Sequence, residues 1–270
     1  MEEVKDFYRA FDEEGRLDRE PLEFQVNLHY IRKFLPPNGR VADIGAGPGR
    51  YALELARIGY QLDVADIMPR FLTQARERAE SERLAARFSG FYEADARDLS
   101  CFSDECFDAS LMLGPFYHLQ HRKEREQAAR ELRRITKQGG VVFAAFMPRI
   151  RHLIQSLQQP EHWKPNHRIE GLRRFLDTGI FNHSDPGRFT GAYFERIEDI
   201  VPFMEDQGFR TIELVGSDGF AQALHENSIR YWREQGESTW DEMMEVICEG
   251  ARSPYLLGAA AHILYIGRRS

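Results

Sequence analysis

The 270-residue sequence predicts an α/β fold built around a doubly wound, mostly parallel sheet. Short apolar runs alternate along the chain with segments of helical periodicity, which is the pattern of successive strand-helix-strand units. The first apolar run, Arg40 to Ile44, is followed by the turn Gly45-Ala-Gly-Pro-Gly49 and a helical segment from Arg50 to Ile58. The next two apolar runs end at Asp66 and Asp95. Ligands of such sheets bind beyond the carboxyl ends of the strands.

The length allows one large domain, and we expect residues 1–270 to form it. Lys and Arg together number 36 and Asp and Glu 43, so the net charge is −7. The basic residues between Arg130 and Arg134 alternate with acids at helical spacing, which is typical of a solvated helix face. Because binding to a nucleic-acid backbone depends on clustered cations, we do not expect a nucleic-acid partner.

The cysteines are Cys101, Cys106 and Cys248, with no Cys-x-x-Cys pair and no histidine cluster at metal-ligand spacing. This usage predicts a reducing compartment and no structural metal. The N-terminal residues are acidic and lack an apolar signal core, and no run approaches the ~20 apolar residues of a bilayer span. We therefore expect a cytoplasmic protein without a membrane segment.

Two helices are expected before the first strand. Apolar and aromatic residues recur at helical spacing over residues 2–13, and a second periodic segment, residues 20–35, ends at the turn Pro36-Pro-Asn-Gly39. The aromatic stripe of the first helix either packs onto the body of the domain or closes over a ligand. We expect residues 1–38 to form a helical cap, with Tyr8 beside a substrate pocket.

The glycine turn has the chemistry of a nucleotide-like site. Glycine permits positive φ and close approach of a ligand to the main chain, and the following helix presents free N–H groups. A dinucleotide fingerprint needs a third glycine where Arg50 stands, which argues against a nicotinamide cofactor. A turn of similar composition that binds nothing is the alternative.

Acids end the next two predicted strands. Tyr60 to Ala65 leads to Asp66, whose carboxylate can accept hydrogen bonds from both hydroxyls of a ribose. The alternative for this aspartate is a helix N-cap, because a helix is predicted from about Pro69 to Arg83. The third strand, Phe88 to Ala94, leads to Asp95-Ala96, which suits recognition of an adenine amino group and ring nitrogen.

Two more parallel strands follow. Phe107 to Leu113 is predicted as the fourth, and the chain leaves it through Gly114-Pro-Phe-Tyr-His-Leu119. A helix from about Arg122 to Thr136 precedes Lys137-Gln-Gly-Gly140, and the fifth strand is predicted from Val141 to Phe146.

Asp43-x-Gly45-x-Gly47-x-Gly49, the two strand-end acids and the passage Arg134-x-x-Lys-x-Gly-Gly140 together resemble the small-molecule branch of the class I S-adenosylmethionine (SAM) methyltransferases, over about residues 38–147. Three stretches are also similar to a group of largely uncharacterised bacterial methyltransferases: Leu113 to Leu119, Phe143 to Arg149 and Phe189 to Phe194.

The resemblance implies seven strands with a final antiparallel hairpin, for which Phe209 to Val215 and Ala260 to Ile266 are the candidates. It also implies that residues 39–147 form a SAM-binding core. The expected reaction is in-line transfer of the methyl group of SAM to oxygen or nitrogen of a small molecule, with S-adenosylhomocysteine (SAH) as the product. The expected cofactor contacts lie at the turn and the strand ends: Asp43, Gly45, Ala46, Gly47, Asp66, Ile67, Asp95, Ala96 and Leu113.

Two long insertions, residues 148–195 and 217–256, interrupt this plan, and loops of such length are uncommon unless functional. All three tryptophans, Trp163, Trp232 and Trp240, fall within them. These aromatics either build satellite cores or form a lid over the site. We expect both insertions to belong to a cap.

Methyl transfer from a sulfonium chiefly needs alignment and a desolvated pocket. Tyr117 and His118, after the fourth strand, are the candidate catalytic residues, although His118 can equally serve to orient its loop. Glu195 and His225 are further candidate bases. The expected substrate pocket comprises Tyr8, Phe116, His183 and Tyr193.

Other acceptors are disfavoured by missing motifs. Gly114-Pro-Phe-Tyr117 lacks the polar residue and second proline with which enzymes that methylate nucleic-acid amines grip their target, and no Pro-Cys nucleophile is present. A protein or RNA methyltransferase and a non-catalytic SAM-binding module remain the alternatives.

Overall fold

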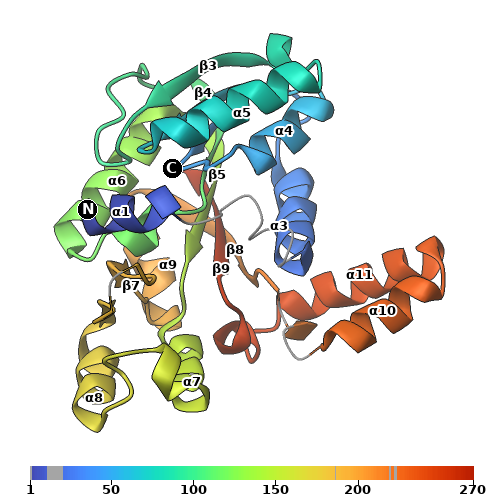
Figure 1. Cartoon of the computed structure of the whole chain (residues 1–270). Coiled ribbons are helices and arrows are strands. Elements are labelled where there is room, and N and C mark those ends of the chain that lie inside the picture. Colours follow the sequence, from blue (N-terminus) through green and yellow to red (C-terminus); the bar gives the residue numbers. More distant parts are fainter. Residues whose placement is uncertain (1, 11–20, 186, 219, 222–223) are drawn as a thin grey trace.

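The computed structural model describes residues 2–10, 21–185, 187–218, 220–221 and 224–270. Its main sheet has seven strands: β1 (Arg40–Ile44), β2 (Gln61–Asp66), β3 (Phe88–Glu93), β4 (Phe107–Met112), β5 (Thr136–Phe146), β8 (Phe209–Gly216) and β9 (Ile263–Arg269). Their spatial order is β3-β2-β1-β4-β5-β9-β8, and β9 runs antiparallel to both neighbours (Figure 1). The predicted mostly parallel sheet with a final antiparallel pair is confirmed.

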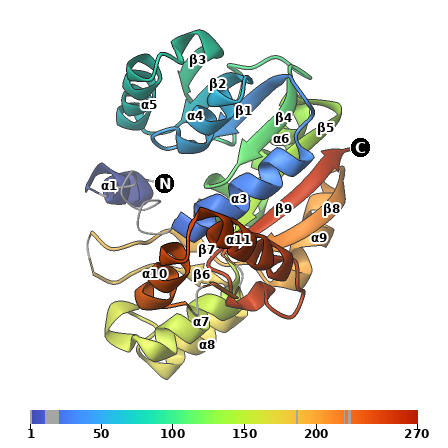
Figure 2. The same ribbon diagram turned by 90° about the vertical axis from the view of Figure 1, so that its right-hand side faces the viewer.

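Helices cover both faces of the sheet (Figure 2). Five of them flank it: α3 (Pro21–Phe34), α4 (Arg50–Arg57), α5 (Pro69–Ser81), α6 (Arg122–Ile135) and α9 (Ile197–Asp206). Successive strand residues point to opposite faces, so Val41 packs with α3 and α4 while Ala42 packs with α6 and α9. Because both faces are covered, Val41 to Ile44 of β1 are buried on both sides, as expected of a parallel strand.

Two strands, β5 and β9, differ from the prediction by more than one residue. β5 begins at Thr136 rather than Val141, because Thr136 already pairs with Phe107 before the register shifts. The predicted loop from Lys137 to Gly140 is thus an irregular part of the strand, with Gly139 at φ +73°. β9 begins at Ile263 rather than Ala260, because the short 3-10 helix η5 (Leu257–Ala259) precedes it.

The first insertion contains the helices α7 (Arg149–Gln158) and α8 (Ile169–Thr178), the 3-10 helix η3 (Pro160–His162) and the hairpin β6 (Ile180–Phe181) and β7 (Ala192–Tyr193). Its aromatic residues gather in a satellite core in which Phe175, Phe181 and Phe194 surround the buried ring of His152. Burial lowers the pKa of His152 to about 3, so this imidazole is a neutral core residue.

The second insertion contains α10 (Glu226–Glu234) and α11 (Glu237–Ala251). α11 packs against α3, and Ile247 and Cys248 join the core on that face of the sheet. The hydroxyl of Tyr30 in α3 donates a hydrogen bond to the carbonyl of Cys248 at 2.6 Å. Phe220 and Trp240 of this insertion pack against the same core, whereas Tyr231 and Tyr255 are exposed.

The first helix, α1 (Glu2–Ala10), lies at the carboxyl-end edge of the parallel strands. Gly191 of the first insertion packs so closely on it that a Cβ there would lie 2.6 Å from Val4. None of the described helices combines the length and apolar character that a membrane crossing needs. The predicted helix over residues 2–13 extends beyond Ala10 into a part of the chain outside the described residues.

Candidate functional site

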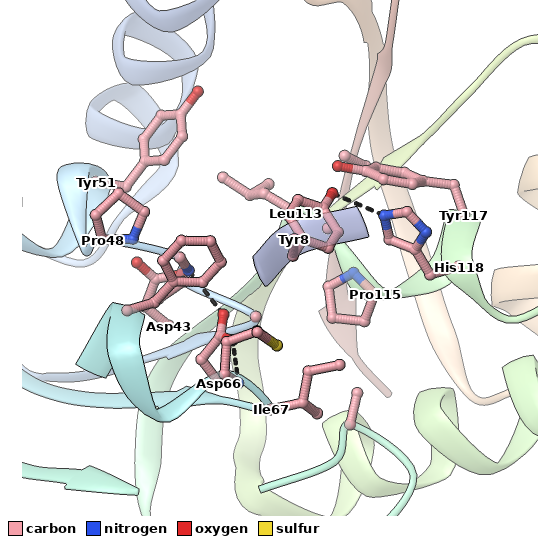
Figure 3. A pocket seen from close by; sticks show the side chains of 18 of the residues that line it. Tyr8, Asp43, Pro48, Tyr51, Asp66, Ile67, Leu113, Pro115, Tyr117 and His118 are labelled. Atoms are coloured by element: carbon pink, nitrogen blue, oxygen red, sulfur yellow. Dashed lines mark hydrogen bonds between the residues drawn. The ribbon is translucent and has the colours of Figure 1, made fainter. Parts of the chain in front are cut away.

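A cavity that is open to solvent lies at the carboxyl ends of the parallel strands. Its floor is the glycine turn after β1, and α1 and α3 contribute its outer wall. In Figure 3, Asp43, Pro48 and Tyr51 lie on one side of the cavity and Tyr117 and His118 on the other.

The conformation of the glycine turn depends on its glycines. Gly45, Gly47 and Gly49 have φ values of +69°, +55° and +76°, which other residues rarely adopt. A Cβ on Gly45 would also lie 2.6 Å from the ring of Pro115. The N–H groups of Gly45 and Ala46 donate to the carbonyl of Ala65 at 2.7 and 3.2 Å. The turn is therefore held against the end of β2.

Asp66 connects this turn to the start of α5. One carboxylate oxygen accepts the N–H of Gly47 at 2.8 Å and the other accepts the N–H of Met68, also at 2.8 Å. Met68, rather than Asp66, occupies the N-cap position of α5. A carboxylate offers about four acceptor positions, so a group of this kind can accept several hydrogen bonds at once.

Asp43 is buried in the cavity wall at the end of β1, with 2% of its surface exposed. The N–H of Ala52 in α4 donates to its carboxylate, whereas the Oδ2 atom has no hydrogen-bond partner among the described residues. Burial, with the negative charge of Asp66, raises the pKa of Asp43 to about 7. An unpartnered buried carboxylate oxygen is costly, which indicates that this wall is built to meet a ligand donor.

Asp95 lies at the far end of the cavity, after β3. Arg97 holds its carboxylate through the main-chain N–H at 2.9 Å and through the guanidinium at 2.6 and 3.0 Å. Burial opposes ionisation, but these bonds and the charge of Arg97 lower the pKa of Asp95 overall. The sequence analysis missed this pairing, although an i, i+2 Asp-Arg spacing allows it.

All the predicted cofactor contacts line this one cavity: Asp43, Gly45, Ala46, Gly47, Asp66, Ile67, Asp95, Ala96 and Leu113. These residues lie together because each is at the end of a strand or in the turn that follows it.

Tyr8 and His118 form a pair across the cavity. The hydroxyl of Tyr8 in α1 lies 2.9 Å from the Nε2 atom of His118, which ends the 3-10 helix η2 (Pro115–His118) after β4. Burial lowers the pKa of His118 to about 3; the main chain of Gly191 opposes this shift, and the nearby His262 adds to it. The imidazole is therefore neutral at physiological pH.

Tyr117 also lines the cavity, and its ring lies between two histidines. The ring centroids are 4.9 Å from His118 and 5.3 Å from His262. His262 precedes β9, whose first residue, Ile263, pairs with Phe146 at the end of β5. The cavity edge thus extends from β3 across β1 and β4 towards β9.

Two lining residues of α3, Glu23 and Asn27, were not among the sequence candidates. Only 6% and 3% of their surfaces are exposed, respectively. Glu23 contacts the Nδ1 atom of His262 at 3.0 Å, and the amide of Asn27 donates to the Tyr51 hydroxyl at 3.1 Å. Their i, i+4 spacing, on a helix that is otherwise apolar on its buried side, is the feature of the sequence from which they could have been predicted.

Three predicted substrate-pocket residues lie outside this cavity. Phe116 is fully buried and stacks on Phe146 at 5.2 Å, because it points to the opposite side of η2 from Tyr117. His183 is a half-buried residue after β6, and its ring contacts the carbonyl of His162 at 3.0 Å. The ring of Tyr193 lies 3.5 Å from the Arg125 guanidinium. Of the four predicted residues, Tyr8 alone lines the cavity.

The two other candidate bases also lie away from it. Glu195 is buried, accepts the Tyr193 hydroxyl at 2.9 Å and lies 3.9 Å from Arg125. Burial raises the pKa of Glu195, and the hydrogen bond from Tyr193 and the charge of Arg125 oppose the shift. His225 is the N-cap residue of α10.

No described residue of either insertion lines the cavity. The first insertion approaches it indirectly through Phe189, whose ring lies 5.7 Å from His118 and 5.8 Å from Phe7 of α1. The wall nearest to solvent is instead built by α1, through Val4 and Tyr8, and by α3. Among the described residues, no group of three or more His, Cys, Asp or Glu side chains is placed to hold a metal ion.

Comparison with known proteins identifies the domain that contains this cavity. Residues 42–144 match the family model described as a methyltransferase domain. Uncharacterised proteins of Mycobacterium bovis and Mycobacterium tuberculosis are each 31% identical over 107 residues, which cover 39% of this chain and 36% of theirs. The match thus spans about a third of the length of these relatives.

Solved structures match almost the whole chain. A SAM-dependent methyltransferase of Methanosarcina mazei has a TM-score of 0.59 at 20% identity, covering 89% of this chain and 96% of that one. One of Thermotoga maritima, described as a possible histamine N-methyltransferase, has a TM-score of 0.58 at 18% identity over 99% and 100%. A geranyl diphosphate C-methyltransferase of Streptomyces coelicolor, solved with SAH, scores 0.53 at 14% identity over 94% and 80%. Residues 42–144 therefore match a methyltransferase domain, and the chain has the fold of these SAM-dependent methyltransferases.

Proposed function

We propose that this protein is a SAM-dependent methyltransferase that methylates oxygen or nitrogen of a small molecule in the cytoplasm. The observation that carries the proposal is the unpartnered Oδ2 atom of buried Asp43, which faces the glycine turn of a methyltransferase domain. A ligand that supplies a hydrogen-bond donor or a positive charge there compensates the carboxylate. SAM carries an ammonium group and a sulfonium charge.

The residues of the cavity fit this cofactor from end to end. Asp66 would accept the ribose hydroxyls, while Asp95 and the main chain at Ala96 would face the adenine edge. Ile67 and Leu113 line the same end and offer apolar contact to a ring. The methionine portion would pass along the glycine turn towards the end of β4.

The cofactor, when bound, supplies a sulfonium methyl group that is transferred by in-line displacement. The chain's own contribution is to align the acceptor and exclude water. Tyr117 and the Tyr8–His118 pair line the part of the cavity beyond β4 and would position the acceptor there. A histidine with a pKa of about 3 is a poor general base at neutral pH, which favours positioning over proton removal.

The cover that α1 and α3 provide over the cavity supports a small acceptor. The Thermotoga maritima neighbour, described as a possible histamine N-methyltransferase, is compatible with transfer to nitrogen.

The test combines binding and turnover. Calorimetry should detect binding of SAM and SAH, and labelled SAM should transfer its methyl group to a component of an ultrafiltrate of cellular metabolites. Methylation confined to the retained macromolecules would support a protein or RNA acceptor instead. Binding without transfer to either fraction would leave a non-catalytic SAM-binding module.

A further inference from the structure

The wall contributed by α3 differs from the rest of the cavity because it carries two oxygen acceptors one helical turn apart. Glu23 and Asn27 are spaced i, i+4, so both project from the same face of the helix. Both line the cavity, and both are more than nine-tenths buried. A buried polar atom is stabilised by a hydrogen-bond partner, and a ligand in the cavity can supply one to Asn27.

Asn27 supplies the second, independent observation. Its amide nitrogen is committed to the Tyr51 hydroxyl at 3.1 Å. Its carbonyl oxygen Oδ1 is buried and has no hydrogen-bond partner among the described residues. In this orientation of the amide, Oδ1 can accept a hydrogen bond from a ligand in the cavity. An orphaned buried acceptor costs roughly 1–3 kcal/mol.

The charges around the cavity identify the donor. Its lining includes four acids, Glu23, Asp43, Asp66 and Asp95, and one arginine, Arg50. The Asp43 carboxylate has an unpartnered oxygen of its own, as described above. A cationic donor with several N–H groups satisfies carboxylate and amide oxygens together, whereas a neutral hydroxyl offers one donor.

We propose that Glu23 and Asn27 form a subsite for an ammonium group. The inference rests on the proposed function and names the chemistry that this wall of the same cavity binds. Two sources share that chemistry: the α-ammonium of the cofactor's amino-acid portion and an amine acceptor. Asn27 adjoins Tyr51 in the first turn of α4, while Glu23 adjoins His262 beside Tyr117. The subsite therefore reaches from the glycine-turn side of the cavity to the β9 side.

The test uses Glu23→Gln, which removes the charge at nearly constant shape, and Asn27→Leu, which removes the orphaned oxygen. Glu82→Gln is the matched control, because it removes the same charge from a carboxylate paired with Arg57 outside the cavity. The first arm compares the affinity for SAH with that for 5′-methylthioadenosine, which keeps the adenosine and thioether but lacks the amino-acid portion. The second arm measures binding of phenethylamine and 3-phenylpropionate to the SAH-saturated protein.

If the subsite holds the cofactor's ammonium, Glu23→Gln should weaken SAH binding about tenfold or more and leave methylthioadenosine binding unchanged. If it holds an acceptor amine, SAH binding should persist, and the variant should lose the wild-type preference for phenethylamine over the isosteric acid. Asn27→Leu should change the same binding measurement as Glu23→Gln, whereas Glu82→Gln should change neither measurement.

Unchanged binding in both arms overturns the proposal, as does an equal loss of SAH and methylthioadenosine affinity. Failure of the wild-type protein to bind SAH would instead reject the proposed function. In that case, the ammonium subsite would still be supported if the ligand-free protein bound phenethylamine but not 3-phenylpropionate. Glu23→Gln should then abolish the binding of phenethylamine.

Discussion

Replacing Asp43 by asparagine should stabilise the ligand-free protein near and above neutral pH. The Asp43 carboxylate is buried beside Asp66 with one oxygen unpartnered, and burial with that neighbouring charge raises its pKa from 3.8 to about 7. The folded protein thus binds this proton more tightly than the unfolded chain. Its contribution to stability is fully present below about pH 4 and is lost as the pH rises through about 7.

The magnitude follows from the pKa difference of about 3 units, each worth 1.36 kcal/mol, which gives roughly 4 kcal/mol. The asparagine side chain would be neutral at every pH and close in shape to protonated Asp43. Above pH 7, the variant should therefore exceed the wild type in free energy of unfolding by up to about 4 kcal/mol. The difference should vanish as the pH falls towards 4.

Chemical denaturation of the ligand-free proteins across this pH range measures the effect. Asp63→Asn is the contrasting control, because Asp63 is buried in β2 but is paired with Arg40 through bonds of 2.6 and 2.8 Å. That substitution should destabilise the protein at neutral pH. A wild type that is more stable than Asp43→Asn at pH 8 would refute the reasoning, since the carboxylate would then be compensated without a ligand.

The remaining predictions concern the ligand. Asp66→Ala should weaken SAM binding at least tenfold, because charged hydrogen bonds are worth roughly 1.5–3 kcal/mol each; unchanged affinity by calorimetry in a folded variant would reject the assignment. His118→Ala should lower affinity and turnover together and modestly, whereas a ~10²–10⁴-fold, pH-dependent loss confined to turnover would reveal a general base. Hydrogen exchange should slow in α1 when SAH binds, because Tyr8 lines the cavity and contacts His118. Residues 226–251 should show no such change, since α10 and α11 contribute no lining residue; equal exchange in α1 with and without SAH would contradict its role as a cover.

The sheet and the positions at its strand ends could be predicted from sequence because their signals are local. An apolar run fixes where a strand ends, and the fold then places Asp43, Asp66 and Asp95 along one edge. The glycine turn was likewise visible, since its positive φ values require residues of one type.

The rest of the site depends on contacts between distant segments. Glu23 meets His262 across 239 residues of sequence, and no local pattern indicates such a contact. Phe116 and Tyr117 are adjacent and both aromatic, yet one enters the core and the other lines the cavity. The direction of each depends on the 3-10 geometry of η2. Tyr193 was predicted beside the substrate, but the guanidinium of Arg125 occupies its ring face.

Calorimetric titration of the wild-type protein and of Asp66→Ala with SAH is the most decisive test of a SAM site at the glycine turn. We expect saturable binding of one SAH per chain to the wild type, at least tenfold weaker binding to the variant, and no binding of NAD by either protein. No detectable binding of SAH to the folded wild-type protein, or equal affinity in both proteins, would contradict it.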